Sequence, residues 1–111
     1  MKVINYRKVK SVKAEEGARE VKVRWLITKD DGAENFAMRL FEVEPEGYSP
    51  LHSHKWEHEV FILEGKGTVR IGEEEKDFKK GDVIFIPGNI EHQFKNEGGK
   101  RLKFLCLIPY L

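Results

Sequence analysis

The sequence predicts an all-β domain of the sandwich, jelly-roll or barrel type. Three observations carry this prediction: apolar and polar residues alternate with a period of two along most of the chain, the alternating segments are short and recur at regular spacing, and glycine-containing turns separate them. Such alternation is typical of half-buried strands, whose successive side chains point to opposite faces of a sheet. No segment is long and periodic enough to predict a helix.

The first half of the chain contains two expected strands. Residues 21–27 place Val, Val, Trp and Ile at every second position, and residues 36–43 are the second strand. Between them, the Lys-Asp-Asp-Gly segment at 29–32 is typical of a tight turn. After residue 43, three helix and strand breakers predict an end to regular structure: Pro45, Gly47 and Pro50.

The second half is expected to hold five short strands joined by glycine-containing turns. In chain order they are residues 59–63, 68–71, 83–86, 92–95 and 102–108. The strands at 83–86 and 102–108 are apolar on both faces. The interior of a barrel can cover only one face of each strand. A second subunit is the simplest cover for the other face, and we therefore expect a homodimer.

Composition and charge limit the classes of function. The chain has 111 residues, which fits one domain spanning 1–111. Its formal net charge is +1, so no overall field attracts nucleic acid or anionic lipid. One cysteine, no signal-peptide-like start and no apolar run near the ~20 residues that span a bilayer predict a cytoplasmic protein without membrane partners. Abundant Lys and Glu are also seen in thermophile proteins.

The four histidines fall into two groups that suit a metal ion. His52 and His54 are two residues apart, so on a strand both imidazoles face the same side. His58 keeps this even spacing, and His92 follows a turn much later in the chain. A lone histidine is usually a surface or core residue, but here none of the four is left over. The pattern favours one divalent transition metal, and imidazole suits Zn, Cu, Fe, Ni and, with harder ligands, Mn.

The segments around these histidines resemble the two sequence motifs of the cupin family. The first, at 47–67, matches through Gly47, the His-Ser-His segment at 52–54, Glu59 and Gly65. This resemblance implies a single cupin barrel, a jelly roll or double-stranded β-helix. The segment at 50–59, Pro-Leu-His-Ser-His-Lys-Trp-Glu-His-Glu, resembles that of small bacterial and archaeal cupins in which four histidines bind the metal, often manganese.

The second motif, at 81–96, matches through Gly81, Pro87, His92 and Asn96, with one departure. Gly88 comes one place early, and an asparagine, residue 89, holds the usual glycine position. Asparagine tolerates the left-handed conformation better than most residues, so the turn is expected to survive.

One ligand position has two candidates. The general family uses three histidines and a glutamate, and Glu59 holds the glutamate position, whereas the four-histidine subgroup would use His58. Neighbouring strand residues face opposite ways, so a regular strand cannot bring both inward. Parity with His52 and His54 favours His58 and places Glu59 on the rim or the outer face.

Alternation also predicts which residues line the pocket. Phe94 shares parity with His92, and Phe104 and Cys106 share one face of the last strand. Arg39 could bind a substrate carboxylate if it points inward. The competing interpretations are core packing for the phenylalanines, a small buried apolar residue for the cysteine and a solvated side chain for the arginine. Trp56 could line the pocket mouth or a dimer contact.

The resemblance leaves the reaction open. Four neutral imidazoles keep the full charge of the ion, and a six-coordinate ion would have two positions free for a substrate, alone or with dioxygen. We therefore expect a dioxygenase-type oxidoreductase acting on a small organic molecule, with manganese as the first candidate and Fe, Ni, Cu or Zn as others. The alternatives are a non-redox isomerase or decarboxylase of a sugar or keto acid, and a ligand-binding module without catalysis.

Overall fold

Residues 1–110, which the computed structural model describes, form nine β-strands and two single-turn 3-10 helices. This confirms the predicted all-β fold class. Neither helix in this described part is long and apolar enough to cross a membrane. The 3-10 helices are η1 (Tyr6–Lys8) and η2 (Lys29–Asp31), and the strands are β1 (Ser11–Lys13), β2 (Arg19–Ile27), β3 (Phe36–Tyr48), β4 (His58–Glu64), β5 (Lys66–Ile71), β6 (Glu74–Lys79), β7 (Val83–Ile86), β8 (His92–Asn96) and β9 (Leu102–Pro109).

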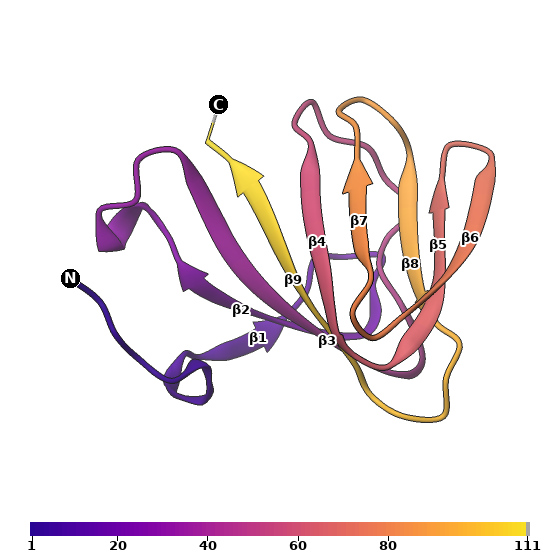
Figure 1. The fold of residues 1–111 in the computed structure, drawn as a ribbon, viewed down its shortest axis with the longest axis horizontal. Helices are drawn as coiled ribbons and strands as arrows, with labels where there is room; N and C mark the ends of the chain where they lie inside the picture. Colours follow the sequence, from indigo (N-terminus) through magenta and orange to yellow (C-terminus); the bar gives the residue numbers. More distant parts are fainter. Residues whose placement is uncertain (111) are drawn as a thin grey trace.

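All the strands belong to one antiparallel sheet that curls on itself. Its order is β6-β5-β8-β3-β9-β4-β7, with β2 also pairing with β3 and β1 with β2. In Figure 1, β2, β3 and β9 run diagonally on the left, and β4 to β8 stand upright on the right. The curl gives the sheet an inner face, which holds the core, and an outer face.

The core comes from the side chains that alternation sends to the inner face. Along β9, Phe104 lies opposite Phe41 on one side and Ile62 on the other, and Cys106 lies opposite Arg39 and Val60. The side chains of Ile62 and Leu102 are fully buried. Burying an aliphatic side chain of this size contributes about 1.5–3 kcal/mol to the free energy of unfolding, so these strands supply much of the driving force.

Strand β3 does not end where the sequence predicts. It continues through Pro45 and Gly47 to Tyr48, so the predicted break after residue 43 is wrong. The pairing with β2 shifts register here, and Glu46 adopts a positive φ of 69°, which is the signature of a bulge. Pro45 has no backbone N–H, and at a bulge none is needed to pair with the neighbouring strand. Gly47 is required because an added Cβ would lie 2.7 Å from the carbonyl oxygen of Arg19.

Two strands have no counterpart in the sequence prediction. Strand β1 has only three residues, and β6 lies between the expected strands at 68–71 and 83–86, where no strand is predicted. Of the six residues of β6, only Phe78 is buried. A strand exposed on almost all of its length shows no alternation, so its pattern contains no periodic signal.

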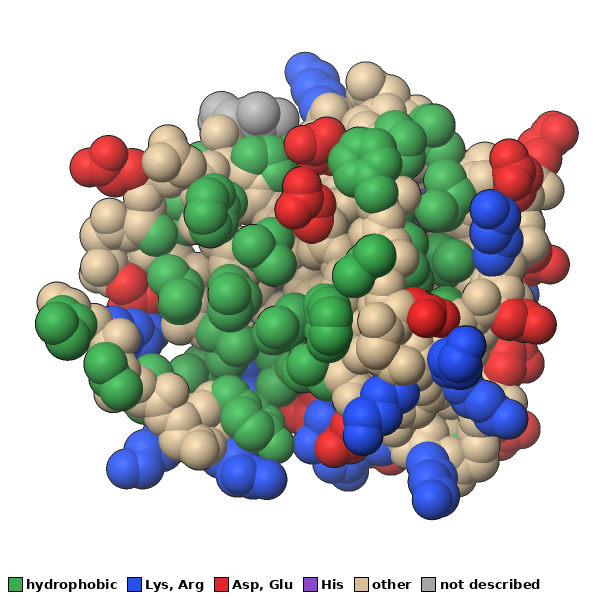
Figure 2. All heavy atoms as spheres, in the orientation of Figure 1, with side chains coloured by type: hydrophobic (Ala, Val, Ile, Leu, Met, Phe, Trp, Pro, Cys, Tyr) green, Lys and Arg blue, Asp and Glu red, His purple; other side chains and the backbone are tan. Residues whose placement is uncertain are grey.

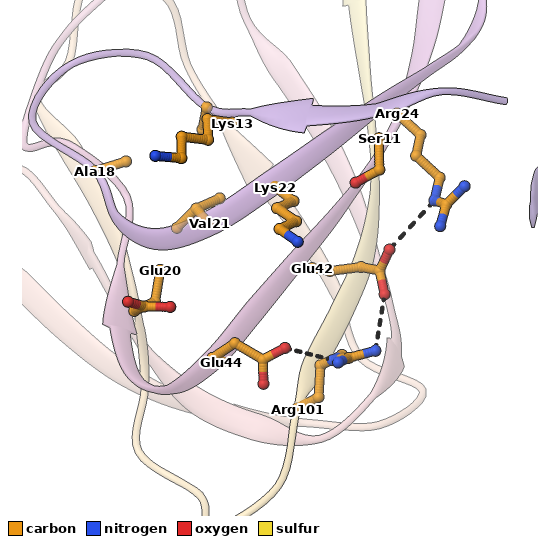
Figure 3. Close-up of a pocket in the computed structure, with 11 residues that line it drawn as sticks. Ser11, Lys13, Ala18, Glu20, Val21, Lys22, Arg24, Glu42, Glu44 and Arg101 are labelled. Carbon is orange, nitrogen blue, oxygen red and sulfur yellow. Dashed lines mark hydrogen bonds and ion pairs between the residues drawn. The ribbon is translucent and has the colours of Figure 1, made fainter.

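Ion pairs tie the outer face of β2 and β3 to the chain segment that precedes β9. The carboxylate of Glu42 contacts both Arg24 (3.3 Å) and Arg101 (3.3 Å), and Arg101 also pairs with Glu44 (2.7 Å) (Figure 3). A terminal nitrogen of Arg24 donates to the carbonyls of Tyr6, Arg7 and Val9. This network holds the N-terminal segment on the sheet, and the hollow drawn in Figure 3 is lined by these paired charges.

Candidate functional site

The four histidines line one pocket on the inner face of the sheet. Its volume is about 340 Å³. The same pocket is lined by the four other residues that alternation assigned to it: Arg39, Phe94, Phe104 and Cys106. Trp56 lines it too, and its ring stacks on His54 with centroids 4.4 Å apart and planes 7° apart. Of the two places that the sequence left open for Trp56, the structure puts it in the pocket.

Backbone pairing fixes where three of the histidines lie. His92 is the first residue of β8, and His52 lies opposite it in an isolated antiparallel bridge. Their backbones exchange two hydrogen bonds, of 3.2 Å and 2.8 Å. His58 is the first residue of β4, where it pairs with Ile86 of β7. Strand pairing thus brings together histidines that lie up to 40 positions apart in the sequence.

The turn after β7 holds the loop that carries His54. Asn89 adopts a φ of 66°, as the sequence predicts for an asparagine in the usual glycine position. Its N–H donates to the carbonyl of His54. Gly88 packs against the carbonyl of Lys55 so closely that a Cβ would collide with it. The two motifs are therefore in direct backbone contact.

The spacings of the rings are close to those around a shared metal ion. With a metal–nitrogen distance of about 2.1 Å, a ring centroid lies about 3.2 Å from the ion, and neighbouring ligand rings lie about 4.5–5.3 Å apart. The centroid of His92 is 4.8 Å from that of His52 and 4.7 Å from that of His58, within this range. The centroid of His54 is 4.3 Å from that of His52 and 5.5 Å from that of His58, just outside it, and 6.0 Å from that of His92.

The electrostatics of the rings also suit metal binding. The pKa of each of the four histidines is lowered, chiefly because burial disfavours the charged ring, and the pKa of His58 falls to about 3. Neutral imidazole is the form that binds metals. Nδ1 of His92 lies 3.0 Å from the carbonyl oxygen of Ile90, so its N–H donates a hydrogen bond there. The unprotonated Nε2 is then available to bind a metal. Nδ1 of His58 is buried without a hydrogen-bond partner.

Glu15 is a site residue that the sequence analysis missed. It lies in the loop between β1 and β2, and its carboxylate is 3.3 Å from Nδ1 of His52. Within residues 1–110, the group whose donor atoms all lie within 4.8 Å of one another is Glu15, His52 and His54. The side chain could orient His52 or bind the ion itself. One glutamate in a loop, in a chain rich in glutamates, gives no sequence signal.

The other candidate glutamate lies outside the pocket. Glu59 is exposed and lines a shallow depression on the outer face with Phe61 and Phe85. Its neighbour His58 is only 5% exposed and points into the pocket. This is the arrangement that strand alternation requires of two adjacent residues.

The rest of the pocket is largely apolar. Phe104 stacks between Phe41 and Phe94, with centroids 5.2 Å and 4.8 Å away. Arg39 and Cys106 lie opposite each other on β3 and β9, and a terminal nitrogen of Arg39 is 3.2 Å from the cysteine sulfur. The pocket thus combines a cluster of groups that can bind a metal, aromatic walls and one arginine.

Comparison with known proteins gives the same picture of the fold. A family model described as a cupin domain matches residues 39–108. The structure of the polyketide cyclase RemF from Streptomyces resistomycificus is 37% identical in sequence and superposes with a TM-score of 0.91. That match covers 98% of this chain and 79% of the cyclase chain.

Two curated proteins are also similar. An oxalate-binding protein from Thermotoga maritima is 32% identical over 99 residues, which cover 86% of this chain and 80% of that protein. The 1-methylthio-D-xylulose 5-phosphate methylsulfurylase of Rhodospirillum rubrum is 38% identical over 71 residues, 64% of this chain and 46% of that enzyme. The chain spans about half the length of the first curated relatives that it matches.

Proposed function

This chain belongs to the cupin family, and we propose that it is a metal-dependent enzyme acting on a small organic substrate. In this proposal His52, His54, His58 and His92 bind one divalent transition metal, with manganese as the first candidate and Fe, Ni, Cu or Zn as others. The observation that carries it is the gathering of four imidazole rings, all with lowered pKa, in one largely apolar pocket.

The first candidate reaction is oxidation of the dioxygenase type. When bound, a divalent metal supplies Lewis acidity and holds oxygen ligands. Four protein ligands on a six-coordinate ion leave two positions, which is enough for a substrate and dioxygen. The chain's own residues would place the substrate: the phenylalanines pack against its apolar part and exclude water from it, and Trp56 covers His54.

The similar proteins favour a second candidate, which is non-redox chemistry at the same metal. One similar structure, 37% identical over 98% of this chain, is that of a polyketide cyclase. The oxalate-binding relative adds a third candidate, in which the pocket binds a small ligand without converting it. All three candidates share the metal and the pocket.

Elemental analysis of the purified, untagged protein tests the proposal. We expect about one equivalent of metal per chain, and loss of that metal in the His58→Ala and His92→Ala variants. Metal-dependent oxygen uptake with a small organic substrate would select the dioxygenase candidate, and turnover without oxygen would select non-redox chemistry. Protein that holds no metal, and takes up none on reconstitution with Mn, Fe, Ni, Cu or Zn, would refute the proposed enzyme.

A further inference from the structure

Arg39 places a positive charge inside the pocket, among aromatic rings. Its guanidinium carbon lies 4.8 Å from the ring centroid of Phe41 and 5.3 Å from that of Trp25. A terminal nitrogen contacts the sulfur of Cys106 at 3.2 Å. Its Nε is buried and has no hydrogen-bond partner. The guanidinium therefore packs against two aromatic rings, while part of its set of hydrogen-bond donors is unused.

No carboxylate neutralises this charge. None of the ion pairs formed within residues 1–110 includes Arg39. Glu15 is the one carboxylate among the described residues that line the pocket, and it pairs with His52. Burial raises the pKa of the Cys106 thiol, so at neutral pH the sulfur is uncharged and leaves the guanidinium charge in place. A partly buried charge without a counter-ion is unfavourable, and an anionic ligand would relieve the cost.

We propose that Arg39 binds the carboxylate of the ligand, so that the pocket takes small organic carboxylates with an apolar or aromatic body. Arg39 would thus define the class of ligand that the pocket takes. That this ligand is a substrate rests on the proposed enzymatic function. The terminal N–H groups that do not contact Cys106 can donate to a carboxylate, and the planar guanidinium matches the geometry of that group. The stacked Phe41, Phe94 and Phe104 pack against the body of the ligand.

A carboxylate suits the site better than a phosphate. A phosphate dianion offers more acceptor oxygens and more charge than a single guanidinium satisfies. Lys13, the other cation of the pocket lining, is exposed. The single arginine of the pocket lining therefore matches the single charge of a carboxylate.

Paired ligands that differ only in charge test this proposal. Benzoate, phenylacetate and pyruvate are each compared with the corresponding amide, by thermal shift and by quenching of tryptophan fluorescence. The protein is used as purified and again after chelation. We expect at least one carboxylate to bind about tenfold or more tightly than its amide in both states, as a charge-assisted pair predicts. The ratio of carboxylate affinity to amide affinity should fall to about one in Arg39→Gln, and part of the preference should remain in Arg39→Lys.

The control is Arg70→Gln, because Arg70 lies on β5 and its Nε donates to the carbonyl of Gly72, outside the pocket. It should keep the carboxylate preference. Three results would overturn the proposal: no carboxylate exceeds its amide, Arg39→Gln keeps the preference, or inorganic phosphate displaces the bound carboxylate at equal concentration. A preference lost on chelation alone would assign the carboxylate to the metal instead. Because we expect the chelated protein to prefer the carboxylate as well, the test does not depend on whether the protein is a metalloenzyme.

Discussion

His58 and Glu59 are adjacent on β4 and face opposite sides of the sheet, so their variants separate the two candidate ligand sets. We predict that His58→Ala lowers metal affinity by about a hundredfold or more, beyond the 10–100-fold typical of residues that only support a ligand. Glu59→Ala should leave the affinity unchanged, because its carboxylate is on the outer face. Competition with a coloured chelator measures both constants, and the reverse ranking would refute the assignment.

Glu15 sharpens this test, because its carboxylate also contacts a candidate ligand. If it orients His52 through Nδ1, Glu15→Gln should cost no more than the 10–100-fold of a supporting residue. The matched control is Glu16→Gln, an exposed neighbour in the same loop. A loss in Glu15→Gln that equals the loss in His52→Ala, with His58→Ala silent, would give the ion to Glu15, His52 and His54.

The lowered pKa of His58 predicts a pH dependence of stability in the metal-free protein. Folded His58 stays neutral down to about pH 3, whereas in the unfolded chain the ring takes up a proton below its usual value of 6.5. The unfolded state therefore binds more protons between these values, and stability falls as the pH drops from about 6.5 to 3. Urea midpoints at pH 7 and pH 4 measure the loss. His58→Phe should lose less stability over this range, and an equal loss would contradict the prediction.

The residues of the pocket were accessible to sequence analysis to different degrees. Phe94, Phe104 and Cys106 lie on regular strands, where a period of two decides the face, and the structure places each of them in the pocket. Glu15 lies on a loop, where no period applies, and only the folded chain brings it to His52. Strand positions can thus be predicted from the pattern, while contacts made by loops cannot.

At the scale of elements, the turn after β7 supports the histidine loop. Gly88 packs on the carbonyl of Lys55, and Asn89 donates to the carbonyl of His54. Gly88→Ala must push the loop away, and we predict a loss of about 1–3 kcal/mol in the free energy of unfolding, as for other overpacked sites. Because the loop carries His54, metal affinity should fall as well. Urea unfolding and chelator competition measure the two effects.

Gly99→Ala is the matched control for this substitution. Nothing lies within 4 Å of a Cβ added at Gly99, and no positive φ is required there. Its effect on the free energy of unfolding should stay within about 0.5 kcal/mol, as for other surface changes. Equal effects of the two substitutions would show that the contact with Lys55 does not position the loop.

The same scale shows where prediction of the fold failed. The strands with a buried face, such as β2 and β9, follow the alternation of their sequences. In contrast, β6 buries only Phe78 and shows no alternation, and β3 crosses Pro45 by means of a bulge. Local breakers predict the end of a strand only when neighbouring strands do not hold it in the sheet. Here the pairing of Tyr48 with Arg19 of β2 and with Lys95 of β8, beyond the proline, provides that support.

At the scale of the whole molecule, the outer face of the sheet carries an apolar surface built from two rows. The register aligns Met38, Leu107 and Phe85 in one row, interrupted by Glu59, and Leu40, Leu105, Phe61 and Val83 in the next. Phe61, Phe85 and Val83 remain 43%, 54% and 74% exposed. Figure 2 shows hydrophobic side chains gathered over the left and centre of this view, with most charges on the right and lower edges.

This surface is where the expected homodimer would form. A stable interface of standard size buries about 1,200–2,000 Å² in total and has an apolar centre with a polar rim, and an apolar surface interrupted by one glutamate, Glu59, suits a second copy of the same face. We predict that the protein is a dimer at micromolar concentration by size-exclusion chromatography with light scattering, and that Phe85→Lys makes it a monomer. Glu75→Lys, on the exposed strand β6, should remain dimeric. A wild-type monomer would refute the interface, and metal binding should persist in the monomeric variant because Phe85 faces away from the histidines.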